Sequence, residues 1–555
     1  MKVALCTCNG KVERRELEEV VKAHVFDDMC KRLPSESFDI VCCEHPAVRK
    51  IGKIHINLND LIFLKQDGAA EKAQLLLQAL GELLNLSPKI IKIDVNTSLL
   101  LKTDDVELAK RAEKHFDPLY IITTNEEMKG IGIPIRGEII EIRGELGKFE
   151  VFLEGINLYT GEKMSEIVVS QVVIPGLTFT KDGVFNSEEG ILDAISNVGG
   201  VLKFEALDYN REMCAVSVNN ISGCRMCECI HNCLEHDNNV LIDYKGCLGC
   251  GRCSSLCPTD ALRLSLMPRD VVRRQVNIFS TYSGDKVLLY VCRNSLNKIY
   301  TSPGKTGTFF PVIVPCIAAL SEVEILYPLL KGFNGVYILA CSNCPHGSFE
   351  GVELAMKICD AFGIRNLILQ DTFTETKIGE LLNAEPVSRD FELNDASKRQ
   401  QLLKIVHRIK ETRNLRDGTL ESINFGEVTI SERCTLCDTC SYMCPTKAIW
   451  KREGEIRFVH GLCINCKLCE KLCPEGAIRV KPTLNLSEFD IEKTIKEDEM
   501  ISCPRCGKRH ISKAEFIKIS EITGQKYSLM FCRDCRPVVV FEGIYKEVFG
   551  GERNE

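Results

Sequence analysis

The chain has 555 residues, which is too long for one hydrophobic core, so we expect roughly three to five domains. Thirty-one cysteines stand out from an otherwise ordinary globular composition. The start of the chain shows no basic leader before an apolar core, and no stretch approaches about eighteen apolar residues, so we expect a reducing, anaerobic cytoplasm and no membrane insertion. The net charge of -7 and the lack of a basic stripe argue against nucleic acid as a ligand.

Residues 1–125 alternate short apolar runs with helical patterns, which predicts a cysteine-bearing α/β domain. Cys6 ends one apolar run, and Cys42 and Cys43 end another, so these thiols could meet at the carboxyl ends of neighbouring strands. A cluster held by some of them and a set of unpaired thiols are both acceptable interpretations. The cysteines concerned are Cys6, Cys8, Cys30, Cys42 and Cys43.

Residues 126–212 show β-branched alternation interrupted by Gly, Pro and Asn turns. This pattern predicts a small antiparallel β domain. It contains no catalytic constellation, and we interpret it as a scaffold.

Residues 213–270 predict an irregular ferredoxin-like domain with two halves. One half has the C-x2-C-x2-C-x3-C-P spacing, in which three close cysteines hold one 4Fe–4S cluster and the fourth ligates the neighbouring cluster. The other half is one residue short, and Leu234 stands where Pro is expected, so Cys214 or His231 could replace a misplaced ligand. The predicted ligand sets are Cys247, Cys250, Cys253 and Cys233 for one cluster, and Cys224, Cys227, Cys229 and Cys257 for the other.

Residues 285–415 contain three apolar strands that each end at a cysteine, with helical stretches between later strands. This βαβ pattern predicts a parallel sheet whose strand ends share one edge. Four thiols would meet there, and we favour a 2Fe–2S cluster, with zinc as the alternative because spacing alone does not separate the two. The ligands are Cys292, Cys316, Cys341 and Cys344. The charged helix that follows, at residues 397–417, is expected to be a solvated connector or a packed surface element.

Residues 425–482 carry two regular copies of the ferredoxin spacing, the most specific signal in the chain. Zinc knuckles are a poor match, since zinc needs four ligands per site and the motif is an interlocked triplet plus one. The predicted 4Fe–4S ligand sets are Cys434, Cys437, Cys440 and Cys473, and Cys463, Cys466, Cys469 and Cys444.

Residues 495–548 contain two C-x2-C knuckles separated by twenty-five residues. They predict a C-terminal zinc ribbon with a closed, structural tetrathiolate site, and a rubredoxin-type iron is the alternative. The ligands are Cys503, Cys506, Cys532 and Cys535.

The segments VCRNSLNKIY, VIVPCIAAL and GVYILACSNCPHGSFEGVELAMKI resemble the delta subunit of methyl-viologen-reducing hydrogenase. That resemblance implies a 2Fe–2S site on the four sheet-edge cysteines and a relay between a hydrogenase and heterodisulfide reductase. The remaining layout is similar to the A component of heterodisulfide reductase. Members of that family carry a flavin domain built on G-x-G-x-x-G, which is missing from this sequence, so we expect no flavin.

These patterns predict a multidomain α/β and α+β protein with three to five 4Fe–4S clusters, one 2Fe–2S cluster and one zinc ion. We expect an electron-transfer subunit of a hydrogenase/heterodisulfide reductase-like or tungsten oxidoreductase-associated complex. It would relay single electrons between another redox protein or ferredoxin and a catalytic subunit, with no catalytic side chain of its own. The alternative is a cluster-based reductase of a disulfide or polysulfide, sited at residues 224–233 or at Cys42 and Cys43.

Overall fold

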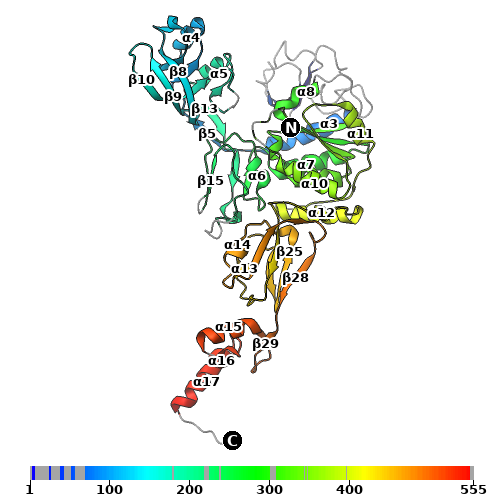
Figure 1. The fold of residues 1–555 in the computed structure, drawn as a ribbon. Coiled ribbons are helices and arrows are strands. Elements are labelled where there is room, and N and C mark those ends of the chain that lie inside the picture. Colours follow the sequence, from blue (N-terminus) through cyan, green and yellow to red (C-terminus); the bar gives the residue numbers. More distant parts are fainter. Residues whose placement is uncertain are drawn as a thin grey trace.

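The computed structural model describes four short strands within the first 68 residues and most of residues 69–549. The gaps are 178–180, 218–223, 237–238, 301–307, 343, 345, 347, 395–396 and 525. Figure 1 shows a β-rich lobe and an α/β unit at one end, a ferredoxin-like unit below them and a helical C-terminal unit at the other end. None of the described helices has both the length and the apolar composition needed to cross a bilayer.

The first four strands form a parallel sheet in the order β2-β1-β3-β4. They are β1 (Val3–Cys6), β2 (His24–Phe26), β3 (Phe38–Cys42) and β4 (Gly52–Ile56). Leu5 pairs with Cys42, so Cys6 and Cys42 lie at the same edge of neighbouring strands. The expected neighbours Cys8, Cys30 and Cys43 lie outside the described residues.

A seven-stranded mixed sheet forms the lobe, in the order β10-β9-β8-β7-β6-β11-β12. Its strands are β6 (Leu99–Lys102), β7 (Leu119–Ile122), β8 (Ile133–Glu145), β9 (Lys148–Asn157), β10 (Lys163–Val169), β11 (Gln171–Val173) and β12 (Val184–Phe185). The β8-β9-β10 part is antiparallel, as predicted, whereas the other pairs are parallel. The expected domain boundary at residue 125 therefore falls inside one sheet, and the scaffold is mixed α/β.

Side chains along β6 alternate between the two faces of this sheet, and each face packs in its own apolar core. Leu99 and Leu101 pack in one core with α4 (Val106–Glu113) and α5 (Gly190–Asn197), while Leu100 packs in a second core on the opposite face. The lobe is joined to the rest of the chain by a two-stranded antiparallel ribbon of β5 (Ile90–Ile93) and β13 (Val201–Phe204).

The α/β unit contains a parallel four-stranded sheet in the order β19-β18-β20-β21, which confirms the predicted parallel sheet. Strands β18 and β20 are buried along their whole length, which accounts for their unbroken apolar runs. The strands are β18 (Val287–Cys292), β19 (Phe309–Val314), β20 (Gly335–Leu339) and β21 (Leu367–Gln370). The helices are α7 (Arg269–Ser280), α8 (Leu296–Tyr300), α9 (Glu322–Leu330), α10 (Glu350–Ala361) and α11 (Glu375–Leu382).

Helix α3 (Ala69–Gly81) joins this unit, although the sequence places it in the N-terminal domain. The side-chain amide of Gln275 in α7 donates to the Ala79 carbonyl at 2.9 Å, and the ammonium of Lys72 lies over the Phe309 ring. The apolar face of an amphipathic helix indicates that the helix packs against another element, but it does not identify that element.

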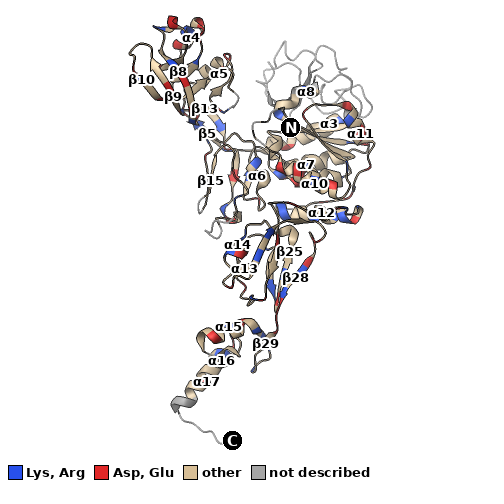
Figure 2. Cartoon of the chain, in the orientation of Figure 1, with Lys and Arg blue, Asp and Glu red and all other residues tan. Residues whose placement is uncertain are grey.

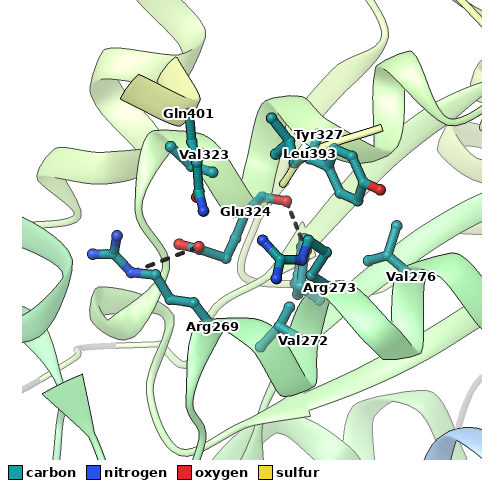
Figure 3. A pocket seen from close by; sticks show the side chains of 10 residues that line it. Arg269, Val272, Arg273, Val276, Val323, Glu324, Tyr327, Leu393 and Gln401 are labelled. Atoms are coloured by element: carbon teal, nitrogen blue, oxygen red, sulfur yellow. Dashed lines mark hydrogen bonds and ion pairs between the residues drawn. The ribbon is translucent and has the colours of Figure 1, made fainter. Parts of the chain in front are cut away.

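Helix α12 (Lys398–Thr412) packs between the α/β unit and the second ferredoxin, so of the two expected roles it is a packed element. Its apolar side chains Leu402, Ile405, Val406 and Ile409 are buried against α9 and the short helix η7 (His460–Leu462). Figure 3 shows Gln401 of α12 beside Arg269 of α7 and Glu324 of α9. Arg269 Nε and Glu324 Oε1 form an ion pair at 3.7 Å.

Two ferredoxin-type units follow one plan, in which short antiparallel strand pairs flank cysteine loops that lead into short helices. The first has β14 (Leu207–Tyr209) paired with β17 (Leu262–Leu264), β15 (Leu234–His236) with β16 (Val240–Ile242), and helix α6 (Arg252–Leu256). The second has β22 (Thr419–Leu420) with β27 (Leu484–Asn485), β23 (Gly426–Ile430) with β26 (Ile478–Pro482), the sheet β24 (Ile449–Arg452), β25 (Glu455–Val459) and β28 (Glu492–Glu497), and helices α13 (Thr439–Met443) and α14 (Leu468–Lys471).

The C-terminal unit differs from the expected zinc ribbon. Its first knuckle lies on the hairpin of β29 (Met500–Ser502) and β30 (Arg509–Ser512). Its second knuckle lies between helices, not on a second hairpin. Those helices are α15 (Lys513–Thr523), α16 (Lys526–Leu529) and α17 (Arg536–Phe549).

Candidate metal centres

The three regular cysteine loops share one backbone device. Two residues in the left-handed region follow the first cysteine, at the second and fourth positions, and they turn the backbone sharply between the three cysteines. These residues are Gly249 and Gly251, Leu436 and Asp438, and Asn465 and Lys467. In the irregular loop, neither Met226 nor Glu228 has a positive φ. The shortened spacing therefore changes the shape of this loop.

In the second ferredoxin, thiols from the two halves lie near one another. Burial raises the pKa of Cys440 to about 12, with further contributions from Cys434 and Cys437. Burial also raises the pKa of Cys466 to about 12, and here Cys463 and Cys444 contribute. Cys473 acts in the same direction on the pKa of Cys434, so in each set a fourth cysteine lies near that comes from the other half.

Backbone N–H groups also face these sulfurs. Ala448 N–H donates to Cys444 Sγ, and Ala477 N–H donates to Cys473 Sγ, both at 3.2 Å. Leu436 N–H donates to Cys434 Sγ at 3.4 Å. Such donors stabilise thiolate charge and are one of the means by which a protein sets a cluster potential.

In the first ferredoxin, the neighbouring thiols differ from one predicted ligand set. Burial raises the pKa of Cys224 to about 12, and the nearby thiols of Cys257 and Cys214 act in the same direction. Cys227 is affected in the same way by burial, Cys257, Cys224 and Cys214. The set that comes together is therefore Cys214, Cys224, Cys227 and Cys257.

Cys229, predicted for that set, lies instead in the regular half. A hydrogen bond with the Cys233 thiol lowers the pKa of Cys229 to about 5. Cys229 and Cys247 both act on Cys250. The regular site thus has Cys247, Cys250 and Cys253 with both Cys229 and Cys233 beside them. The missing residue after Cys227 places Cys229 with the regular half, and Cys214, which the sequence offered as a substitute, takes its place.

The sheet-edge cysteines lie at or just after the carboxyl ends of β18, β19 and β20. The Sγ atoms of Cys316 and Cys344 are 3.8 Å apart, and the Cys341 thiol contacts those of Cys344 and Cys292. Among these four described residues, no three sulfurs all lie within 4.8 Å of one another. Zinc bonds of about 2.3 Å would hold every pair of sulfurs about 3.8 Å apart, so the arrangement is more open than a zinc tetrahedron.

The C-terminal thiols have the compact geometry that the sheet-edge set lacks. One Sγ from each of Cys503, Cys506, Cys532 and Cys535 lies within 4.8 Å of the others. Cys506 Sγ and Cys532 Sγ are 3.6 Å apart. Although burial acts to raise it, hydrogen bonds from the backbone of Cys532 and Cys506 lower the pKa of Cys503 to about 6. A thiolate is therefore favoured there, as a metal ligand requires.

A histidine pair joins the first ferredoxin to the sheet edge. His231 Nε2 and His346 Nδ1 are 2.9 Å apart, and both rings lie within 4.8 Å of Cys250 Sγ. His346 lies two residues after Cys344. The Arg252 side chain donates from Nε to Glu350 across the same contact at 2.9 Å. The sequence offered His231 as a substitute ligand and His346 only as a neighbour of a cysteine group, and nothing in the spacing brings residues 231 and 346 together.

The two ferredoxin units also approach each other. The Cys466 thiol is close enough to Cys224 to contribute to its raised pKa. Figure 2 shows acidic and basic residues interspersed along the described part of the ribbon.

Three segments match the family described as 4Fe-4S binding domain, at residues 240–263, 427–450 and 456–479. They contain the three regular loops, and the irregular loop at 224–233 lies outside them. The chain therefore carries ferredoxin-type 4Fe–4S domains. The cysteine groups described above fit such clusters.

The chain is also similar to several curated proteins. An iron-sulfur protein of Rhodospirillum rubrum is 41% identical over 51 residues, covering 9% of this chain and 27% of the relative. Electron transport protein HydN of Escherichia coli (strain K12) is 28% identical over 92 residues, covering 16% and 52%. Hydrogenase-4 component A of the same strain is 33% identical over 79 residues, covering 13% and 38%. The chain thus spans about a quarter to a half of the length of these relatives.

Proposed function

We propose that this chain is an iron–sulfur electron-transfer subunit of a cytoplasmic, anaerobic oxidoreductase complex. The observation that carries the proposal is the order of the thiol groups through the fold. The sheet-edge set contacts the regular loop of the first ferredoxin through His231 and His346. The remaining set of that unit lies beside Cys466 of the second ferredoxin. Five thiol groups therefore form a continuous row, as single-electron transfer between distant partners requires.

The residues of these groups support four 4Fe–4S clusters and one binuclear cluster. When bound, the clusters accept and release single electrons at potentials set by burial and hydrogen bonds to sulfur. The chain itself holds the thiolates in groups, donates N–H groups to the sulfurs and buries some of the cysteines in every group except that of Cys444, Cys463, Cys466 and Cys469, which are half-buried. None of these roles needs a side chain acting as an acid or base.

For the sheet-edge site we favour a 2Fe–2S cluster over zinc. The thiol contacts run in series from Cys316 to Cys344, then to Cys341 and Cys292, so the four thiols can be shared as the pairs Cys316 with Cys344 and Cys292 with Cys341. A binuclear cluster needs one such pair for each iron. The compact C-terminal set fits a single tetrahedral ion, and we propose a structural zinc there. The hydroxyl of Ser512, at the end of the hairpin strand that follows the first knuckle, donates to the Thr435 carbonyl in the second ferredoxin.

The proposed partners are a second redox protein or ferredoxin and a catalytic oxidoreductase subunit. The similarity to hydrogenase-4 component A makes a hydrogenase-type partner the first to test. Flavin and nucleic acid are not required by any of the described sites.

Anaerobic purification tests the proposal directly. We expect about eighteen irons and one zinc per chain, no released flavin, and cubane and binuclear signals in electron paramagnetic resonance (EPR). Cys341→Ser should remove the binuclear signal and leave the cubane signals, whereas the buried Cys359→Ser in α10 should leave both. A colourless protein, or turnover of a disulfide or polysulfide by the chain alone, would contradict an electron-transfer role.

A further inference from the structure

Helix α12 begins at the junction of the two ferredoxin units. Its first residue, Lys398, reaches the first unit, where its N–H donates to Asp260 Oδ2 at 2.9 Å and its ammonium donates to the Ser255 carbonyl. These two acceptors flank Cys257 in the sequence. The Lys398 ammonium is also paired with Glu322 at 3.4 Å. The start of α12 is thus fixed to the loop that carries Cys257.

The next residue, Arg399, reaches the second unit. Its Nη2 donates to the Asn424 carbonyl at 2.6 Å, and its guanidinium lies over the Phe425 ring at 3.8 Å from the centroid. The following residue, Gly426, begins β23 so close to Cys463 that a Cβ there would lie 3.1 Å from the Cys463 sulfur. Arg399 is therefore held directly behind the cysteine loop of the second unit.

Arg399 is 2% exposed, and two of its donors are unused. Nε and Nη1 are buried and have no hydrogen-bond partner within the described part of the chain. Burial lowers the pKa of Arg399 to about 10, so the guanidinium is charged at neutral pH. A buried cation with unpaired N–H groups destabilises the folded protein unless negatively charged hydrogen-bond acceptors lie near it. The groups that stabilise its charge are Glu322, already paired with Lys398, and the thiols of Cys463 and Cys224.

We propose that Arg399 is a positioning residue of an electron-transfer junction between the two ferredoxin units. Its unused N–H groups donate to sulfur of the clusters held by the Cys224 and Cys463 loops, and its charge raises the reduction potential of both. The inference rests on the proposed function, since it requires those clusters. The step at this junction is the passage of one electron, which oxidises one cluster and reduces the other and needs no proton.

The test is an EPR-monitored redox titration of the anaerobically purified full chain. Arg399→Met keeps the contact with Phe425 but removes the charge and the donors, so the reduced clusters lose stabilisation. We expect the reduced-to-oxidised ratio of two cubane clusters to fall at least tenfold at a fixed potential, which equals 59 mV for one electron. Arg399→Lys keeps the charge and should shift the ratio less. Lys404→Met, the same charge change at an exposed position of α12, should shift it less than twofold.

Iron content separates the possible outcomes. If wild type and Arg399→Met both hold full iron and the ratio changes no more than in Lys404→Met, the junction role is wrong while the electron-transfer function stands. If Arg399→Met loses iron, the Arg399→Lys variant decides: a ratio equal to wild type with full iron supports a charge-based role, and loss of iron there as well shows a purely structural residue. A wild-type chain without these two clusters would overturn both proposals.

Discussion

At the residue scale, the same cysteine loop is made with different residues in the two ferredoxin units. The first unit uses Gly249 and Gly251, which adopt a positive φ without strain. The second uses Leu436, Asp438, Asn465 and Lys467, each of which costs about 1 kcal/mol or more in this region. The second unit therefore stores strain that its packing and bound metal must offset.

Relieving this strain should stabilise the unit. Lys467 is exposed, has φ of 58° and caps α14, so Lys467→Gly removes the steric cost without removing a buried contact. We expect an increase of about 0.5–1 kcal/mol in the free energy of unfolding, seen as a higher midpoint in thermal unfolding followed by cluster absorbance. Lys471→Gly, in right-handed helix on the same exposed side, is the matched control and should be destabilising.

The grouping of Cys214 with Cys224, Cys227 and Cys257 also gives a residue-scale prediction. Cys214→Ser should lower the iron content by about four per chain and remove one cubane signal. Cys359→Ser removes an equally buried thiol far from any group and should leave iron unchanged. If Cys214→Ser keeps its full iron content, Cys214 is not the fourth ligand and another residue holds that position.

At the element scale, the cysteines at the ends of parallel strands were the site residues whose positions the sequence predicted best. The apolar runs before Cys292 and Cys341 are continuous because both β18 and β20 are buried on two faces, and parallel strands bring their ends to one edge. The partner of α3 and the placement of β6 and β7 with β11 were not predictable, because each depends on pairing between segments far apart in the chain. Cys214 was only one of two possible substitutes, since it lies outside the repeated spacing.

The burial of a histidine in η7, the short helix that packs against α12, predicts that the stability of the second ferredoxin depends on pH. His460 in η7 is 1% exposed, and its Nε2 accepts a hydrogen bond from Asn485 N–H at 2.8 Å. Burial lowers its pKa to about 4, whereas in the unfolded chain the imidazole titrates near 6.5. The unfolded state therefore binds a proton first as pH falls, and stability is lost progressively from about pH 6.5 down to about pH 4.

The loss should reach about 3 kcal/mol at the acid end, and about 1 kcal/mol of it should be visible between pH 7.5 and 5.5 in urea unfolding of the second ferredoxin. His460→Asn removes the titrating group and should flatten this part of the profile. An identical slope in His460→Asn would place the pH dependence elsewhere.

At the scale of the whole molecule, the hydrophobic cores show which parts the clusters need. The first ferredoxin, the α/β unit, α3 and α12 share one core, which packs the sheet-edge site and the regular loop together. Phe425, Leu484 and Phe489 of the second ferredoxin belong to this core, while the rest of that unit and the C-terminal unit have cores of their own. The lobe has two cores of its own and connects through the ribbon in which Ile93 pairs with Val201. Geometrically, the lobe is an insertion into a hairpin.

This arrangement predicts that the whole lobe is dispensable for cluster binding. Replacing residues 94–200 with Asn-Gly would close β5 and β13 by a two-residue turn that suits antiparallel strands. We expect the shortened chain to keep its full iron content and unchanged EPR signals, because no candidate ligand lies in the lobe. A single change in the shared core, Leu76→Asp in α3, buries an unpaired charge and should lower iron content although it lies far from every cysteine loop in the sequence. Loss of iron in the shortened chain, with the Leu76→Asp chain fully loaded, would show that the lobe and not the shared core supports the clusters.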